Sequence, residues 1–174
     1  MPFKHQATLC ELSSLTGQPG RPGWLLLWRC DIQTFLPLED FAASARVLDS
    51  KRLGKQRLET LQILKALADP SYGWQNHPAV LMWRGHERQL ALYGNHITTE
   101  WKRRGYQDSV HQQIANLWDR WPHDSNEKPW WLGDPRLHIS HQSNLLRKAP
   151  WAYGHLWPNV PRDLGYWWPT EDEK

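Results

Sequence analysis

Apolar side chains recur at intervals of three and four residues from residue 37 onward, and this periodicity constrains the fold more than any other feature. Such spacing is typical of helices with one buried face. Only Gln33–Leu36 could be extended, and no second segment with a two-residue period could pair with it. The pattern predicts an all-α fold: one compact domain of about five helices, over residues 41–48, 50–68, 78–104, 110–121 and 134–147.

Capping residues and helix breakers set the expected boundaries of these helices. Asp40 and Asp49 precede two of them, and acidic residues favour a helix N-terminus. The helix after Asp49 is expected to bury Leu53, Leu58, Leu61, Leu64 and Leu67. Pro78 is expected to open one long helix that ends at Gly105 and buries Trp83, Leu90, Tyr93, Ile97 and Trp101. After Pro150, prolines and aromatic residues predict an irregular C-terminal segment.

The first 31 residues differ from the rest of the chain. Residues 17–23 consist mainly of glycine and proline, and the flanking sequence has no sustained helix or strand period. Both cysteines, Cys10 and Cys30, lie in this stretch. We therefore expect residues 1–31 to be a disordered extension, or to precede the true translation start, and residues 32–174 to form the functional domain.

The composition excludes several classes of protein. The mean hydropathy is -0.74 and no apolar run approaches the roughly 18 residues of a membrane span. Two cysteines without metal spacing, and no secretory signal, favour a reducing cytoplasmic setting. A net charge of +3 allows an anionic partner without requiring one. Thirteen tryptophans suit half-buried walls and grooves, because each indole N–H needs a hydrogen-bond partner.

Basic side chains gather in three places that could contact phosphates. The densest group, Lys51, Arg52, Lys55, Gln56 and Arg57, surrounds Glu59 on one predicted helix. The alternative is a solvated helix with an ordinary Lys55–Glu59 pair, but Gly54 inside the helix favours close approach of a phosphate backbone. Arg103 and Arg104 suit either DNA or the dipole at a helix C-terminus. The third group combines Arg147 and Lys148 with Trp151 and Tyr153, as binding of a nucleic-acid backbone and stacking on bases require.

The histidines suggest a weaker alternative, a metal-dependent hydrolase. His138 and His141 are three residues apart and could share a helix face, with His77 or Asp134 as a third ligand. No zinc-type spacing supports a metal site, and none is predicted. Hydrogen-bonded core histidines are the other interpretation. His77, just before Pro78, could cap a helix or donate to a phosphate.

Four motifs, read together, resemble a known family. The motifs are Gln33-Thr34-Phe35-Leu36-Pro37, Arg52-Leu53-Gly54-Lys55-Gln56-Arg57, Asn76-His77-Pro78-Ala79-Val80 and Ser143-Asn144-Leu145-Leu146-Arg147-Lys148. Their order and spacing resemble those of the bacterial branch of the pyrimidine dimer DNA glycosylases of the endonuclease V type, over about residues 32–169. The resemblance implies a helical, cofactor-free base excision repair enzyme that binds and bends double-stranded DNA. Such a protein would be a monomer located with the nucleoid.

The resemblance also implies a mechanism. In this family the N-terminal α-amine attacks the sugar C1′ to form a Schiff base, a glutamate assists, and the backbone is then cleaved in an AP lyase step. Glu59 matches the glutamate, and the amine would lie at Ile32 if translation begins there. In a longer chain, Lys51 or Lys55 would have to replace the amine. A non-catalytic DNA-binding module is the alternative. The residues matched to DNA binding are Lys51, Arg52, Lys55, Gln56, Arg57, His77, Arg103, Arg104, Arg147, Lys148, Trp151 and Tyr153.

Overall fold

The computed structural model describes residues 32–122 and 127–169, and the chain divides into two units, Met1–Asp31 and Ile32–Lys174. The described part of the second unit contains seven α-helices, one 3-10 helix and no strand, which confirms the all-α class. The helices are α2 (Phe41–Val47), α3 (Ser50–Ala68), α4 (Pro78–Leu81), α5 (Glu87–Arg103), α6 (Val110–Leu117), the 3-10 helix η2 (Trp118–Arg120), α7 (Pro135–Lys148) and α8 (Pro150–Tyr153). None of the described helices is long and apolar enough to cross a membrane.

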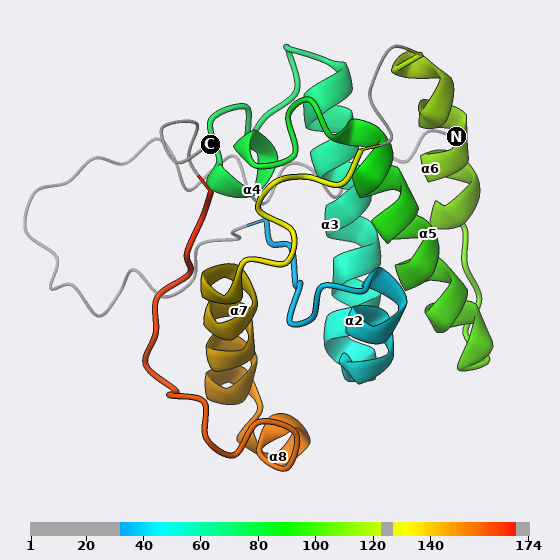
Figure 1. The fold of residues 1–174 in the computed structure, drawn as a ribbon. Coiled ribbons are helices and arrows are strands. Elements are labelled where there is room, and N and C mark those ends of the chain that lie inside the picture. Colours follow the sequence, from blue (N-terminus) through cyan, green and yellow to red (C-terminus); the bar gives the residue numbers. More distant parts are fainter. Residues whose placement is uncertain (1–31, 123–126, 170–174) are drawn as a thin grey trace, which may run out of the picture. The chain divides into compact units, whose positions relative to one another are not determined.

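Helix α3 is the centre of the second unit (Figure 1). It packs against α5 and α6, while α2 packs on α5 and α8 follows α7 closely. The side chains of Asp40 and Asp49 accept backbone N–H groups at the starts of α2 and α3, as expected, and Asp134 caps α7 in the same way. In Figure 1, the extended segment 32–37 runs between α7 on one side and the α2–α3 layer on the other.

Three expectations about the helices are wrong. The long helix expected from Pro78 to Gly105 is broken into α4 and α5, because Gly85 adopts a φ of +79° that a helix does not contain. Trp83 lies in this break and is nevertheless fully buried. Leu58 is 48% exposed instead of buried, since it lies on the outer face of α3. The segment after Pro150, expected to be irregular, begins with the single turn of α8.

Gly54 is needed for helix packing, not for the approach of a phosphate. A Cβ placed at Gly54 would lie 2.9 Å from two ring carbons of Trp101 on α5. That indole is fixed in place, because its Nε1 donates to the Gln107 carbonyl at 2.9 Å and its ring stacks on Tyr106 at 4.0 Å. The glycine therefore allows α5 to lie close against α3, and the interpretation that Gly54 favours a phosphate is not required.

We expect Gly54→Ala to lower the free energy of unfolding by about 1 kcal/mol. Overpacking costs about 1–3 kcal/mol, and only about 1 kcal/mol of helix propensity offsets it. Urea denaturation monitored by circular dichroism measures the change. Gly73→Ala is the matched control because nothing lies within 4 Å of the added methyl. Equal stability of Gly54→Ala and wild type would contradict the packing argument.

Candidate active site

The extended segment 33–37 is held in place by side chains from α3 and α5. Gln56 accepts the Phe35 N–H at 2.9 Å and donates to the Gln33 carbonyl at 2.9 Å. The Tyr93 hydroxyl donates to the Phe35 carbonyl at 2.7 Å. Because Gln56 and Tyr93 are fully buried, these bonds satisfy groups that water cannot reach.

Two histidines of α7 hold the other side of the same segment. His141 Nδ1 accepts the Leu36 N–H at 2.8 Å, and the Leu36 carbonyl lies 2.8 Å from His138 Nδ1. His138 Nε2 accepts the Gly133 N–H at 3.0 Å, so the proton of a neutral His138 is on Nδ1 and is donated to Leu36. Burial, with a smaller contribution from His138, lowers the pKa of His141 to about 3. His141 therefore acts as a neutral hydrogen-bonding group.

This arrangement bears on the metal hypothesis for the histidines. His138 and His141 bind the backbone of Leu36, which corresponds to the interpretation as core histidines. His77 caps α4, where Nδ1 accepts the Ala79 N–H at 3.1 Å, and this confirms the first of its two predicted roles. Within residues 32–122 and 127–169, no group of three His, Cys, Asp or Glu side chains could hold a metal ion.

Glu59 projects from the middle of α3 toward the beginning of the extended segment. Its side chain is 5% exposed, Lys55 Nζ lies 3.2 Å from Oε1, and the Gln33 backbone donates a hydrogen bond to the carboxylate. Burial raises the pKa of Glu59 to about 7, although Lys55, Gln33 and Lys148 each oppose the shift. Its second oxygen, Oε2, is buried and has no hydrogen-bond partner within the described part of the chain. A carboxyl group in this state can exchange a proton near neutral pH.

A cluster of positively charged side chains lies near Glu59, where the end of α7 comes close to the start of α3. Arg52 donates to the Lys148 carbonyl at 3.1 Å and to the Asp49 carboxylate at 2.8 Å. Lys148 is close enough to Glu59 and Lys55 for their charges to interact. The site therefore combines a buried carboxyl group, two lysines and the backbone of residue 33.

A family model described as pyrimidine dimer DNA glycosylase matches residues 32–113. This stretch is slightly less than half of the chain, and over it the chain is similar to that family. The matched residues contain the extended segment, Gln56, Glu59 and His77, whereas α7 and Lys148 lie beyond them. No curated protein and no solved structure shows a significant match to the chain.

A pyrimidine dimer DNA glycosylase family implies a DNA substrate. Five of the side chains predicted to bind DNA are exposed on α3, at the end of α7 or on α8. Trp151 is the most open of them, with 79% of its surface exposed. Arg147 donates to Asn144 at the last turn of α7 and is otherwise exposed. These five exposed residues are Lys51, Lys55, Arg147, Lys148 and Trp151.

Two other residues predicted to bind DNA, Gln56 and Arg57, are held by contacts within the protein. Gln56 has no exposed surface and holds the extended segment, so the expected DNA contact is not available in this conformation. Arg57 is 15% exposed and pairs with Asp108 at 2.5 Å, while its guanidinium lies 4.9 Å from the centre of the Trp101 ring. Both side chains connect α3 to neighbouring elements.

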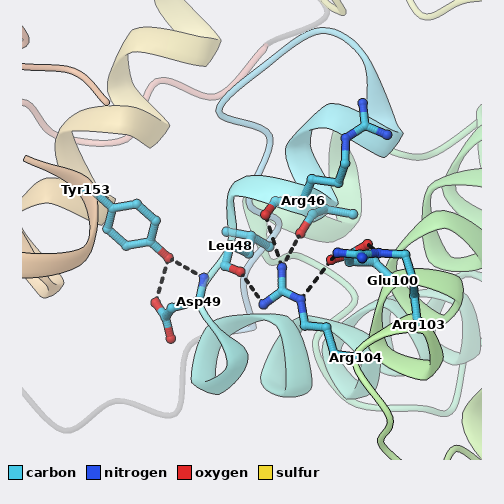
Figure 2. A network of polar contacts seen from close by, with 8 residues as sticks. Arg46, Leu48, Asp49, Glu100, Arg103, Arg104 and Tyr153 are labelled. Atoms are coloured by element: carbon cyan, nitrogen blue, oxygen red, sulfur yellow. Dashed lines mark hydrogen bonds and ion pairs between the residues drawn. The ribbon is translucent and has the colours of Figure 1, made fainter. Parts of the chain in front are cut away.

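Figure 2 shows that Arg104 also has a structural role. Its guanidinium donates to the carbonyls of Leu48 at 2.8 Å and Arg46 at 3.0 Å, which fastens the C-terminal end of α5 to the end of α2. Arg103 and Arg104 both pair with Glu100, and these hydrogen bonds, that of Arg103 first, lower the pKa of Glu100 to about 2. Arg103 remains 67% exposed, so only this member of the pair could also reach a phosphate.

Tyr153 is likewise fixed by an internal contact, at the left of Figure 2. Its hydroxyl donates to the Asp49 carboxylate at 2.6 Å and accepts the Asp49 N–H at 3.0 Å. The ring has no exposed surface, so it does not offer the stacking face expected for it. Tyr153 instead joins α8 to the first turn of α3, where Arg52 also binds Asp49.

Sequence reasoning missed the residues that fix the extended segment. Tyr93 was expected only as part of an apolar stripe, and the histidines of α7 were assigned no backbone partner. One signal was present, since polar side chains at positions 56, 138 and 141 fall on otherwise apolar helix faces. Buried polar side chains need hydrogen-bond partners, and these are most often backbone groups. Polar residues at these positions therefore indicate that a backbone segment packs against them.

Proposed function

We propose that this protein is a DNA repair glycosylase with associated AP lyase activity, which excises pyrimidine dimers or another modified pyrimidine. In this proposal, the amine of a chain that begins at residue 32 attacks C1′ of the damaged nucleotide. The C1′–N bond to the pyrimidine breaks, and the amine and C1′ form a Schiff base. The C3′–O bond then breaks by β-elimination, after a base has removed a proton from C2′.

The observation that carries this proposal is the hydrogen bond between the Gln33 backbone and the Glu59 carboxylate. An amine on residue 32 would be one residue from this bond, and the contacts of Gln56, Tyr93, His138 and His141 would hold it in place. Positioning of this kind contributes several kcal/mol to a reaction that joins two groups. An α-amine, with a pKa near 8, is also neutral more often at pH 7 than a lysine near 10.4.

Glu59 is proposed to move protons during both steps. A carboxyl group with a pKa of about 7 is present in both protonation states near neutral pH. The protonated form can supply a proton to the departing pyrimidine, and the ionised form can accept one or stabilise the positively charged sugar. Lys55 pairs with Oε1, and the buried Oε2 has no hydrogen-bond partner within the described part of the chain, so this oxygen is free to hold or release a proton.

The test uses a full-length protein with a protease site that frees the amine of residue 32 when it is cut. The substrates are an ultraviolet-irradiated duplex and a duplex with one abasic site, each in the presence of sodium borohydride. We expect the cut protein to form a covalent adduct, because borohydride reduces the Schiff base to a stable amine. Absence of an adduct on both duplexes would remove the lyase proposal, and salt-dependent binding alone would then favour a non-catalytic DNA-binding module.

A further inference from the structure

In any chain that contains Asp31, the nitrogen of Ile32 is a peptide amide and cannot form a Schiff base. The rest of the site does not change with the start of the chain, because Glu59, Lys55 and Gln56 lie on α3. A chain of this length therefore needs another amine if it is to use the same carboxylate. Besides the α-amine of Met1, the lysine side chains are the remaining source, and three of them lie near the start of α3 or the end of α7: Lys51, Lys55 and Lys148.

The contacts of these lysines distinguish one from the others. Lys55 Nζ is bound to Glu59 at 3.2 Å, so its ammonium holds the carboxylate. Lys51 lies exposed on the first turn of α3, two turns before Glu59. Lys148 comes from the end of a different helix, and within residues 32–122 and 127–169 it forms no ion pair of 4 Å or less.

The surroundings of Lys148 make its charged form less stable than that of a fully exposed lysine. Partial burial, followed by repulsion from Lys55, Arg147 and Arg52, lowers the pKa of Lys148, and only Glu59 acts in the opposite direction. The Arg52 guanidinium donates to the backbone carbonyl of Lys148 at 3.1 Å, which holds the end of α7 beside α3. The side chain retains exposed surface, so a DNA strand can reach it.

We propose that Lys148 is the nucleophile of the full-length chain, a role that rests on the glycosylase and lyase function proposed above. Its amine adds to the C1′ aldehyde of an abasic site, and the resulting carbinolamine loses water to give an iminium ion. A base, for which we propose Glu59, removes a proton from C2′, and the C3′–O bond breaks with release of the phosphate. Water then hydrolyses the iminium and restores the lysine amine. No oxidant or metal is needed for any of these steps.

The experiment traps the intermediate on the uncut, full-length protein. The probe is a duplex with one abasic site, reduced with sodium borohydride, and the adduct is located by mass spectrometry of tryptic peptides. We expect the adduct on Lys148. Lys148→Arg keeps the positive charge but cannot form a Schiff base under these conditions, so trapping should fall at least about 100-fold while duplex binding stays within about 3-fold.

The remaining outcomes are decisive in either direction. Lys65→Ala, at the far end of α3, is the control and should trap as wild type does. Wild-type trapping by Lys148→Arg, or an adduct mapped to Met1, Lys51 or Lys55, would overturn the assignment of Lys148. If the protein cut before residue 32 gives an adduct but the uncut protein gives none, the Lys148 proposal fails alone. If neither forms an adduct, the lyase function fails with it.

Discussion

Replacement of Glu59 by glutamine is expected to abolish strand cleavage and leave duplex binding within a few-fold of wild type. The carboxyl group is the only one in the described site that can exchange a proton near pH 7, and loss of a general acid or base typically costs about 10²–10⁴ in rate. Glutamine retains the size and the oxygen that faces Lys55, so the fold of α3 should persist. Single-turnover cleavage of a duplex with one abasic site, together with fluorescence anisotropy for binding, measures the two effects.

The control for this variant is Glu127→Gln, which removes a carboxylate from an exposed position outside the site. It should cleave at the wild-type rate. Wild-type cleavage by Glu59→Gln would reject Glu59 as a proton-transfer residue. Loss of binding in parallel with cleavage would instead indicate that Glu59 supports the DNA surface.

The same variant has a pH-dependent effect on stability. Burial raises the pKa of Glu59 from 4.5 to about 7, so between these values the folded protein holds a proton that the unfolded chain has lost. The free energy of unfolding of the wild type therefore falls as pH rises through this window, by about 3 kcal/mol in total. Glu59→Gln lacks this contribution, and its stability relative to wild type should increase from pH 4.5 to pH 8. Urea denaturation at the two pH values tests this, and a constant difference would contradict it.

The sequence predicted those parts of the fold that depend on neighbouring residues. Asp49 caps α3 because its side chain reaches N–H groups two and three residues later, an interaction that residue order alone specifies. Gly105, with a φ of +86°, follows the end of α5 for an equally local reason. The break at Gly85 was missed because the apolar stripe continues through it, and Trp83 is buried whether or not it is helical.

The site could be predicted only in part, for a related reason. The roles of Glu59 and Ile32 are predicted through the family motifs, but the contacts that hold the segment join residues far apart in sequence. His141 binds Leu36 across 105 positions, and no periodicity carries that information. The roles of charged side chains were also ambiguous. The guanidinium of Arg104 could bind a phosphate or could join two helices, and the sequence does not distinguish these roles. Only the three-dimensional structure shows that its donors bind the carbonyls at the end of α2.

Gln56→Met is expected to lower cleavage at least about 100-fold in the protein with a free amine on residue 32, with little effect on duplex binding. Methionine fills a similar volume but leaves the Phe35 N–H and the Gln33 carbonyl without their partner. Each unsatisfied buried group costs about 1–3 kcal/mol, and a displacement of about 1 Å at a reacting group can cost about 100-fold in rate. Cleavage rate, binding and urea denaturation are all measured.

Gln62→Met is the matched control, since it makes the same substitution on an exposed position of the same helix. It should behave as wild type in all three measurements. The comparison also separates positioning from general loss of stability, because Gly54→Ala weakens α3 without touching the segment and should leave the cleavage rate of the folded protein unchanged. If Gln56→Met cleaves at the wild-type rate despite lower stability, the contacts on residues 33–35 serve folding alone, and a fixed amine on residue 32 is not required for the chemistry.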